Sequence, residues 1–197
     1  MSSRSATSYS PRSPLPKLEK EVNVVVPTRT DDLTAQEPGE QAMPFTLRPI
    51  AEGDFFAWLA LFEGYNEFYQ TPEHDTKAVL VWTWLTENTK EISAVVAEDA
   101  EGKLIGFVHY SGFVRPLVGE TGIQIDDLFV LPDARQTGVG TALIGRVHEV
   151  AAQRNAGVVR WQTAKDNHAG RKLSSSLAAK TAWVTYDLPV SIKEENA

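Results

Sequence analysis

The stretch from residue 126 to residue 145, DDLFVLPDARQTGVGTALIG, decides the fold of this chain. Two adjacent acids open an apolar run, a Pro-Asp turn closes it, and Gly138 and Gly140 precede residues with helical spacing. A strand that leads through a glycine loop into a helix leaves backbone N–H groups unpaired at the positive end of the helix dipole. Such a place binds phosphate. The same glycines also suit a plain tight turn, and the pattern alone does not choose between the two.

Two nucleotide-binding patterns fail on this loop. The pattern G-x-x-x-x-G-K-[ST] is absent from the sequence. The pattern G-x-G-x-x-G fails because Leu143 stands where the third glycine belongs. The sequence therefore argues against ATP and against dinucleotides as ligands of the loop.

Outward from this stretch, hydrophobic spacing and turn residues predict alternating strands and helices. Strands are expected over residues 45–50, 92–99, 103–113, 122–131, 158–163 and 183–190. Helices are expected over 55–68, 75–87, from the glycine loop to near Gly157, and over 167–181 with Asn167 as N-cap. This order predicts one α/β domain with a mixed, mostly antiparallel sheet flanked by helices.

The domain is expected to span residues 44–190, between two tails. Residues 1–43 are rich in Ser, Thr and Pro and carry mixed charges, which predicts a disordered tail, and residues 191–197 are expected to form a second disordered end. The first residues lack the continuous apolar run of a secretory signal, and the acids that follow do not suit a transit peptide. Met43 begins the regular pattern, so the tail is either a dispensable extension or the result of a misplaced start.

Composition narrows the class of protein. Of the 197 residues, 42% are hydrophobic and 23% charged, as in ordinary globular proteins, and no apolar run is long enough to span a bilayer. The chain has no cysteine, which excludes disulfides and thiolate metal sites, and its four histidines lack metal-ligand pairing. The net charge of −7 argues against nucleic acid as a partner and suits a cationic substrate. We therefore expect a cytoplasmic protein without metal, membrane or nucleic-acid partners.

Residues 135–140, RQTGVG, fit the [RQ]-x-x-G-x-[GA] signature of the GNAT acetyltransferases. Residues 125–173 as a whole resemble the acetyl-CoA-binding half of members related to fungal histone/polyamine acetyltransferases and to spermidine/spermine acetyltransferase. The expected order of elements from residue 45 to residue 190 also matches that family. The resemblance implies a GNAT fold, acetyl-CoA as acetyl donor and N-acetyltransferase activity.

The resemblance also assigns cofactor contacts. It implies that backbone groups of the central strand pair with the pantetheine arm, and that amides of the glycine loop hold the pyrophosphate. The strand positions are Leu128, Phe129 and Val130, and the loop positions are Arg135, Gln136, Thr137, Gly138, Val139, Gly140 and Thr141. Asn167 stands where the family commonly contacts the cofactor, although the same side chain serves equally well as a helix cap.

Asp126 and Asp127 could serve two needs of an amine acetyltransferase, which are a place that attracts the ammonium and a route for its proton. Only a neutral amine attacks a thioester, and an amine with a pKa of about 10.4 is neutral in roughly one molecule in 10³ at pH 7. Consecutive residues on a strand point to opposite faces unless the strand bulges, and the resemblance implies a bulge at about this place. In the polyamine-acetylating relatives an acidic pair stands here, which implies that Asp126 removes the proton through water and Asp127 holds the amine. The plain alternative is one solvated acid and one that caps a turn or pairs with an arginine.

One position departs from the family. A tyrosine seven residues after the asparagine commonly protonates the departing sulfur, and here that position is Ser174. A serine hydroxyl is too weak an acid for this task, although a thiol with a pKa of about 8.5 leaves largely unassisted. Tyr110, Tyr186 or an ordered water are the possible substitutes, and the sequence leaves the acid unassigned.

Tyr65, Tyr69 and His109 are expected in the substrate pocket beside Asp127, with a place in the core as the alternative. The predicted last strand, residues 183–190, is expected to pair with a second subunit in a homodimer. The resulting prediction is direct acetyl transfer to a primary amine: a polyamine, an amino acid, an aminoglycoside-like amine or a protein lysine. The alternatives are an acyl-CoA-binding module that has lost its general acid and an interaction protein that works through its tail.

Overall fold

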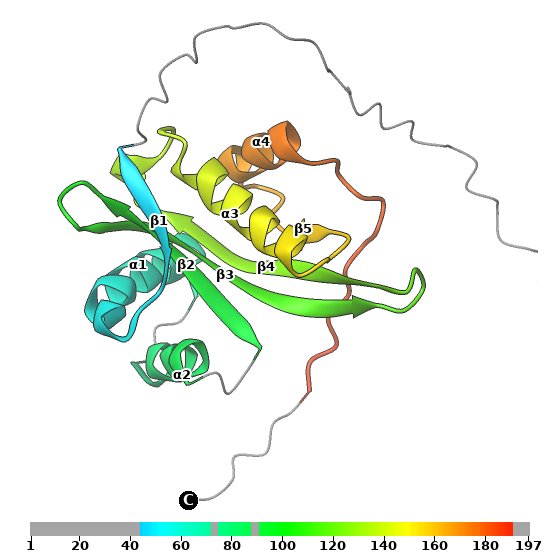
Figure 1. Cartoon of the computed structure of the whole chain (residues 1–197), viewed down its shortest axis with the longest axis horizontal. Helices are drawn as coiled ribbons and strands as arrows, with labels where there is room; N and C mark the ends of the chain where they lie inside the picture. Colours follow the sequence, from blue (N-terminus) through cyan, green and yellow to red (C-terminus); the bar gives the residue numbers. More distant parts are fainter. Residues whose placement is uncertain (1–43, 72–74, 88–90, 191–197) are drawn as a thin grey trace, which may run out of the picture. The chain divides into compact units, whose positions relative to one another are not determined.

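Five strands form one sheet and lie in it in chain order, β1-β2-β3-β4-β5 (Figure 1). The structure is a computed structural model that describes residues 44–71, 75–87 and 91–190. The strands are β1 Phe45–Pro49, β2 Ile92–Asp99, β3 Leu104–Arg115, β4 Glu120–Val130 and β5 Val159–Trp161. The pairs β1–β2, β2–β3 and β3–β4 are antiparallel, and the pair β4–β5 is parallel. The predicted mixed, mostly antiparallel sheet is therefore confirmed.

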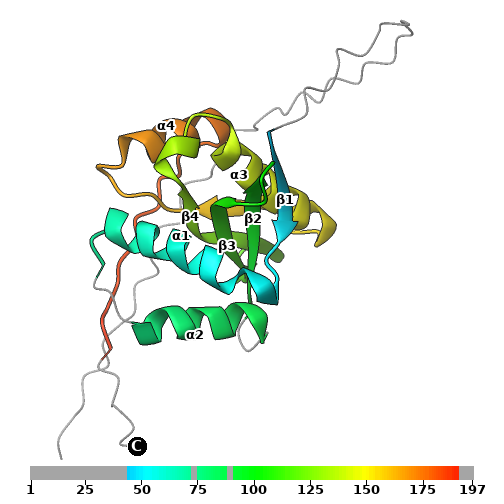
Figure 2. The same cartoon turned by 90° about the vertical axis from the view of Figure 1, so that its left-hand side faces the viewer.

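Helices cover both faces of this sheet. They are α1 Phe55–Phe68, α2 Asp75–Thr86, α3 Val139–Gln153 and α4 His168–Leu177, with short 3-10 turns at Glu52–Asp54 and Pro132–Ala134. Figure 2 shows α1 and α2 on one face of the sheet, and α3 and α4 on the other. The predicted tails, residues 1–43 and 191–197, and with them Met43 as the start, lie outside the described residues.

Each face of the sheet has its own core. On the α3 face, Val95 and Ala97 of β2 pack in a cluster with Leu143 and Val147 of α3. On the other face, Val96 packs with the aromatic side chains that α1 provides. A strand buried on both faces reads as a continuous apolar run, which is how ISAVVAED of β2 reads. The two cores hold β4, the strand with the acidic pair, between α1 and α3.

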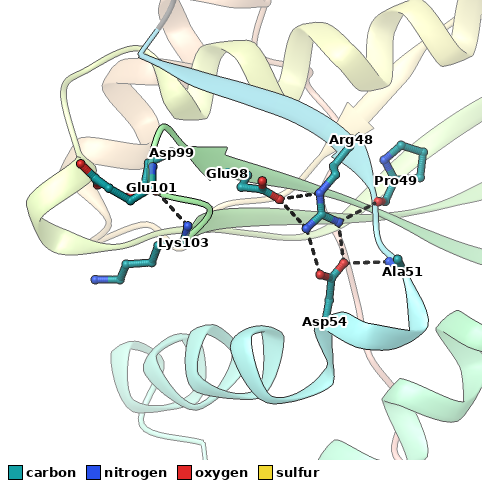
Figure 3. A network of polar contacts seen from close by, with 8 residues as sticks. All are labelled: Arg48, Pro49, Ala51, Asp54, Glu98, Asp99, Glu101 and Lys103. Atoms are coloured by element: carbon teal, nitrogen blue, oxygen red, sulfur yellow. Dashed lines mark hydrogen bonds and ion pairs between the residues drawn. The ribbon is translucent and has the colours of Figure 1, made fainter.

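Arg48 of β1 ties the sheet to the start of α1 (Figure 3). Its Nε donates to Glu98 Oε2 of β2 at 2.6 Å, and its Nη1 and Nη2 donate to the two carboxylate oxygens of Asp54 at 2.6 and 2.9 Å. Asp54 Oδ2 also accepts from the N–H of Ala51 at 2.8 Å. The hydrogen bond from Arg48 lowers the pKa of Asp54, and this effect outweighs the opposing effect of burial. The network fixes the point at which α1 leaves the sheet.

The predicted strand over residues 183–190 is wrong, because the described chain continues from α4 to residue 190 without a strand (Figure 1). Its apolar side chains lie in water: Trp183 is 83% exposed and Tyr186 is 89% exposed. Strand propensity is realised only where packing and an edge partner support it. The edge strand β5 has only three residues with which another strand could pair. The segment instead makes a side-chain contact, in which Gln162 donates to the hydroxyl of Thr185 at 2.8 Å.

The predicted end of α3 near Gly157 is also wrong. The helix ends at Gln153, and Asn155 takes the left-handed conformation there with φ 53°. Asparagine tolerates this region better than most residues. Gly157 lies beyond the helix, where its N–H donates to Thr121 O at 3.0 Å. The helix predicted over 167–181 also ends early, at Leu177, and the other helices and strands lie within a few residues of their predicted ranges.

Candidate active site

Strand β4 carries a bulge at Asp126. In the register with β3, Asp127 lies opposite His109, and Ile125 lies opposite Tyr110. Asp126 therefore has no opposite residue on β3 in the described sheet. A bulge of this kind inserts one residue and locally twists the strand.

The inserted residue reverses the alternation of β4. Before the bulge, Ile123 and Ile125 point into the core on the α3 face. After it, Phe129 belongs to the core under α1, although plain alternation from Ile125 would place it on the α3 face. One extra residue turns every following side chain to the other face. Asp126 and Asp127 consequently line one cavity, although consecutive strand residues normally point apart.

A gap opens between β4 and β5 at the same place. The two strands pair at three positions, Ile123 to Ile125 with Val159 to Trp161, and no strand within the described sheet covers that side of β4 from Asp126 to Val130. A cavity of about 90 Å³ lies at this opening. Its walls include Tyr65, Tyr69, Ile125, Asp126, Leu128, Ile144, Trp161, Gln162, Thr163, Asn167, Gly170, Leu173 and Ser174.

A second, larger cavity of about 440 Å³ lies between β4, α1 and α2. It is lined by Phe62, Tyr65, Asn66, Tyr69, Thr71, Lys77, Val81, Trp84, Ile92, Asp126 and Asp127. Tyr65, Tyr69 and Asp126 belong to the walls of both cavities. The predicted residues Tyr65, Tyr69, Asp126 and Asp127 therefore come together where the two cavities meet.

Asp127 is held by donors on two sides. His109 Nδ1 lies 2.9 Å from Asp127 Oδ2, and the hydroxyl of Tyr65 donates a second hydrogen bond. Burial raises the pKa of the Asp127 carboxyl, but the hydrogen bonds from His109 and Tyr65 outweigh it, so the pKa lies below its usual value. Burial and the nearby Asp127 raise the pKa of Tyr65 well above its usual range, so this hydroxyl stays protonated.

Asp126 has the opposite electrostatic environment. Partial removal from water raises the pKa of its carboxyl, and the negative charge of Asp127 adds to this effect. A hydrogen bond from Ser111 opposes the shift without cancelling it. A pair of acids whose pKa values are pushed apart is typical of a site that assigns them different roles.

The glycine loop has an open backbone directly before α3. Gln136 and Gly138 both have positive φ, at 66° and 93°, directly before α3. A Cβ at Gly138 would meet no atom within 4 Å, so the space beside the loop is open. The first bond of α3 runs from Ala142 N to Gly138 O, which leaves the amides before Ala142 without a partner inside the helix.

Other predicted cofactor residues divide between loop and core. The Arg135 guanidinium lies over the rings of Phe68 and Phe129, 5.5 and 5.7 Å from their centroids, and its Nε donates to Val130 O at 3.0 Å. Val139 is buried in the core on the α3 face. Leu128 lines the smaller cavity. Thr137, Gly140 and Thr141 lie at the loop and the first turn of α3.

Asn167 and Ser174 both line the smaller cavity from α4. Asn167 Oδ1 accepts from Gly170 N at 2.8 Å, which confirms the predicted N-cap. The Ser174 hydroxyl accepts from Trp161 Nε1 and donates to Gly170 O, each at 2.8 Å. Its single proton is therefore committed to a backbone carbonyl.

The other expected residues lie away from the cavities. Tyr110 is buried in the core on the α3 face, and Tyr186 is exposed beyond α4. His109 is fully buried behind Asp127, and it lines neither of the two cavities. Its expected contact with substrate stays a prediction.

Sequence reasoning missed two groups of this site. Trp58 donates from Nε1 to His109 Nε2 at 3.0 Å, across 51 residues of sequence. Lys77 of α2 lines the larger cavity and donates to Asn66 Oδ1 at 2.7 Å. Helical spacing placed both Trp58 and Asn66 on α1, but no local pattern indicates which strand residue a helix will face.

The described residues contain no group of three or more His, Cys, Asp or Glu side chains that could hold a metal ion. In the same residues no helix combines the length and the apolar character needed to cross a bilayer.

The sequence matches the profile of the Acetyltransferase (GNAT) family over residues 58–175. It is 30% identical over 141 residues to the D-amino-acid N-acetyltransferase HPA3 of Saccharomyces cerevisiae, covering 71% of this chain and 88% of that protein. The fold is similar to a ribosomal-protein-alanine N-acetyltransferase from Brucella melitensis biovar Abortus 2308 (TM-score 0.63, 23% identity, 75% of this chain and 99% of that one). It is also similar to AAC(6')-Iy in complex with a bisubstrate analog, CoA-S-monomethyl-acetylneamine (TM-score 0.64, 18% identity, 75% and 99%).

Proposed function

Since this chain belongs to the GNAT family of acetyltransferases, and is an N-acetyltransferase that uses acetyl-CoA, we propose that it acetylates the primary amine of a small molecule by direct transfer. The observation that carries this proposal is the bulge at Asp126. It brings two carboxylates into the wall of one cavity, next to the gap between β4 and β5. An amine held there would lie beside the opening at which the family binds its acyl donor.

The two acids take different parts in the reaction. Asp127, kept ionised by its donors, holds the substrate ammonium. Asp126, whose carboxyl has a raised pKa, is the better proton acceptor and takes the proton through a water. Removing a proton from an amine of pKa about 10.4 at pH 7 costs about 4–5 kcal/mol. An adjacent base reduces this cost because proton transfer accompanies the attack.

The residues of the gap and the loop fit the acyl donor. Acetyl-CoA supplies the acetyl group as an activated thioester. The open side of β4 at Leu128, Phe129 and Val130 offers backbone groups to the pantetheine arm, and the space beside Gly138 admits an anion to the amides at the start of α3. Asn167 lines the gap, and its Oδ1 caps α4. These groups would hold the donor and orient it, which supports the predicted cofactor residues as a proposal.

No acid for the sulfur is required in this proposal. The hydroxyl of Ser174 already donates its hydrogen bond to Gly170 O, so its single hydrogen is engaged. The pKa of the Tyr65 hydroxyl is raised above its usual range, which makes it a weaker acid than an ordinary tyrosine. A thiol with a pKa of about 8.5 leaves as its thiolate with little help. General acid catalysis is typically worth about 10²–10⁴-fold, so the enzyme is expected to be slower than a relative with an acid in this position.

An amino acid is the first substrate class we propose. The relative from Saccharomyces cerevisiae is a D-amino-acid N-acetyltransferase. The larger cavity combines two carboxylates with the ammonium of Lys77, which suits an amine that also carries a carboxylate. Polyamines and aminoglycoside-like amines, which carry several positive charges, are the second class. We therefore propose an amino acid before a polyamine as the substrate.

The test is CoA release from acetyl-CoA with amino acids, their amides, polyamines and lysine peptides. We expect turnover with amines, and higher kcat/KM for an amino acid than for its amide. Binding of acetyl-CoA without turnover on any amine would instead support the alternative of an acyl-CoA-binding module that has lost its acid. Equal kcat/KM for amino acids and amides would remove the proposed class while leaving the reaction intact.

We further propose that the working domain spans residues 44–190 and that the protein is cytoplasmic, as the absence of cysteine suggests. A chain that begins at Met43 should retain full turnover. We also propose a homodimer in which residues 183–190 pair with a second copy, because the apolar side chains of this segment are largely exposed. A monomeric mass in light scattering would remove the homodimer.

A further inference from the structure

We propose that Trp58 and His109 form a positioning chain behind Asp127, in which the indole fixes the one tautomer of His109 that donates to the substrate-holding carboxylate. This inference rests on the proposed function, because it takes Asp127 as the group that holds the substrate ammonium. It goes beyond that function in giving roles to two buried side chains that touch neither cavity. Neither Trp58 nor His109 is a catalytic residue in this scheme, since both act through Asp127.

The geometry allows one arrangement of hydrogens for a neutral ring. The indole Nε1 of Trp58 is a donor and has no lone pair to offer, so His109 Nε2, at 3.0 Å, must accept. The ring hydrogen is then on Nδ1, which donates to Asp127 Oδ2 at 2.9 Å. Both rings are fully buried, so no bulk water competes for these bonds. The tautomer is thus set by the partner on the far side of the ring.

A proton on Nε2 would break this arrangement. A doubly protonated ring would direct its Nε2–H against the indole N–H, and the other neutral tautomer would direct a lone pair of Nδ1 against the carboxylate. Both are unfavourable in a buried place, where an unsatisfied polar group is costly. His109 therefore gives Asp127 a hydrogen bond without cancelling its negative charge, which remains for the ammonium.

The surroundings of His109 support a fixed ring. The titratable and charged groups near it are Asp126 and Asp127 of β4 and Tyr65 of α1, while Lys77 of α2 lies against the ring of Phe62. The ring contacts those of Phe107, at 4.4 Å between centroids, and Phe62, at 6.1 Å, and each of its nitrogens has one hydrogen-bond partner. In this fully buried position the partner of Nε2 therefore decides which hydrogen bond Nδ1 makes.

Nitrogen-15 NMR of the histidine rings tests the chain directly, without any need for turnover. The sequence has four histidines, and His109→Asn identifies the signals of His109 by their loss. In the wild-type protein at pH 7.5 we expect the neutral ring with its hydrogen on Nδ1. A ring with its hydrogen on Nε2, or a doubly protonated ring, would overturn the inference. This result stands whether or not the protein turns over the amines tested.

Kinetics of Trp58→Phe test the role toward substrate. The variant keeps an aromatic ring and removes the N–H donor, so His109 is free to accept a proton and neutralise Asp127. We expect the KM for the amine to rise about 5-fold or more at pH 6.5 and less at pH 8, with the KM for acetyl-CoA unchanged, as the loss of one charge-assisted hydrogen bond predicts. Trp82→Phe is the matched control, because Trp82 lies 5.2 Å from Trp58 in the same aromatic cluster.

The rescue variant separates positioning from packing. In the double variant Trp58→Phe/His109→Asn, the introduced amide can donate to Asp127 from the place of Nδ1 and cannot become charged. We expect the pH dependence of the amine KM that Trp58→Phe introduces to disappear in this double variant. If Trp58→Phe and Trp82→Phe raise the KM equally, or if the double variant keeps the pH dependence, the chain does not position Asp127.

Discussion

Replacing Asp127 with asparagine removes one charge from the larger cavity and leaves its shape nearly unchanged. The carbonyl of the introduced amide can still accept from Nδ1 of His109, so the hydrogen bond of 2.9 Å behind the side chain has a replacement. What is lost is the attraction for the ammonium, at a side chain that is 27% exposed. A hydrogen bond to a charged group is worth about 1.5–3 kcal/mol, which corresponds to a loss of roughly 10–150-fold in kcat/KM for the amine.

The assay is steady-state release of CoA, with the amine and acetyl-CoA varied separately. We expect Asp127→Asn to raise the KM for the amine and to leave the KM for acetyl-CoA within about twofold, because a residue that binds one substrate uniformly changes only its KM. Asp127→Glu is the control that keeps the charge and moves it by one methylene. A fall in kcat with an unchanged amine KM would refute the assigned role, since it would make Asp127 the proton acceptor.

Asp126→Asn should lower kcat by about 10²–10⁴-fold with little change in the amine KM, the range expected for loss of a general base. In the wild-type enzyme, kcat should fall as the pH drops through the raised pKa of Asp126, and the variant should not show this fall. The same fall of kcat at low pH in the variant would assign it to another group. Ser174→Ala should keep kcat within about threefold, because the serine hydroxyl already donates its hydrogen bond to Gly170 O; a fall of about 10² or more would mean that the serine takes part in the chemistry. Arg48→Met should destabilise the fold by about 1–2 kcal/mol in urea unfolding, as expected for part-exposed hydrogen bonds to carboxylates. Because the folded-state pKa of Asp54 is lowered, this contribution is complete above the ordinary pKa of an aspartate and is lost progressively as the pH falls through the lower folded-state pKa; a gap between variant and wild type that does not shrink as the pH is lowered would contradict this origin.

Much of the fold follows from local patterns in the sequence. The helix predicted after the glycine loop, the strands predicted over residues 92–99 and 103–113, and the N-cap at Asn167 depend on spacing within a few residues, and all three are confirmed. The strand predicted over 183–190 fails because a strand requires a partner edge, which residues distant in sequence must provide. The predicted end of α3 is wrong because Asn155, and not Gly157, takes the left-handed conformation after the helix.

The site was predictable in its residue types and less so in its geometry. Tyr65, Tyr69, Asp126 and Asp127 do meet at the cavities, but the two acids share a wall only because of a bulge, which the family resemblance implied and no residue in β4 indicates by itself. The contact between Trp58 and His109 joins residues 51 positions apart, and helical spacing by itself cannot show it. Packing between elements, which fixes which helix faces which strand, holds the information that local patterns lack.

The bulge at Asp126 couples the site to the fold, and this explains why the two acids can differ so strongly. It sets Asp127 opposite His109 in the sheet register, and leaves Asp126 with Ser111 and the opening of the gap as its surroundings. The same inserted residue turns Phe129 toward α1, where its ring packs against those of Phe107 and Tyr65. If residue 126 paired with β3 in regular alternation, the register after it would shift by one residue, and both Asp127 and Phe129 would turn to the opposite face. The acid pair therefore cannot lose its arrangement without unpacking the core under α1.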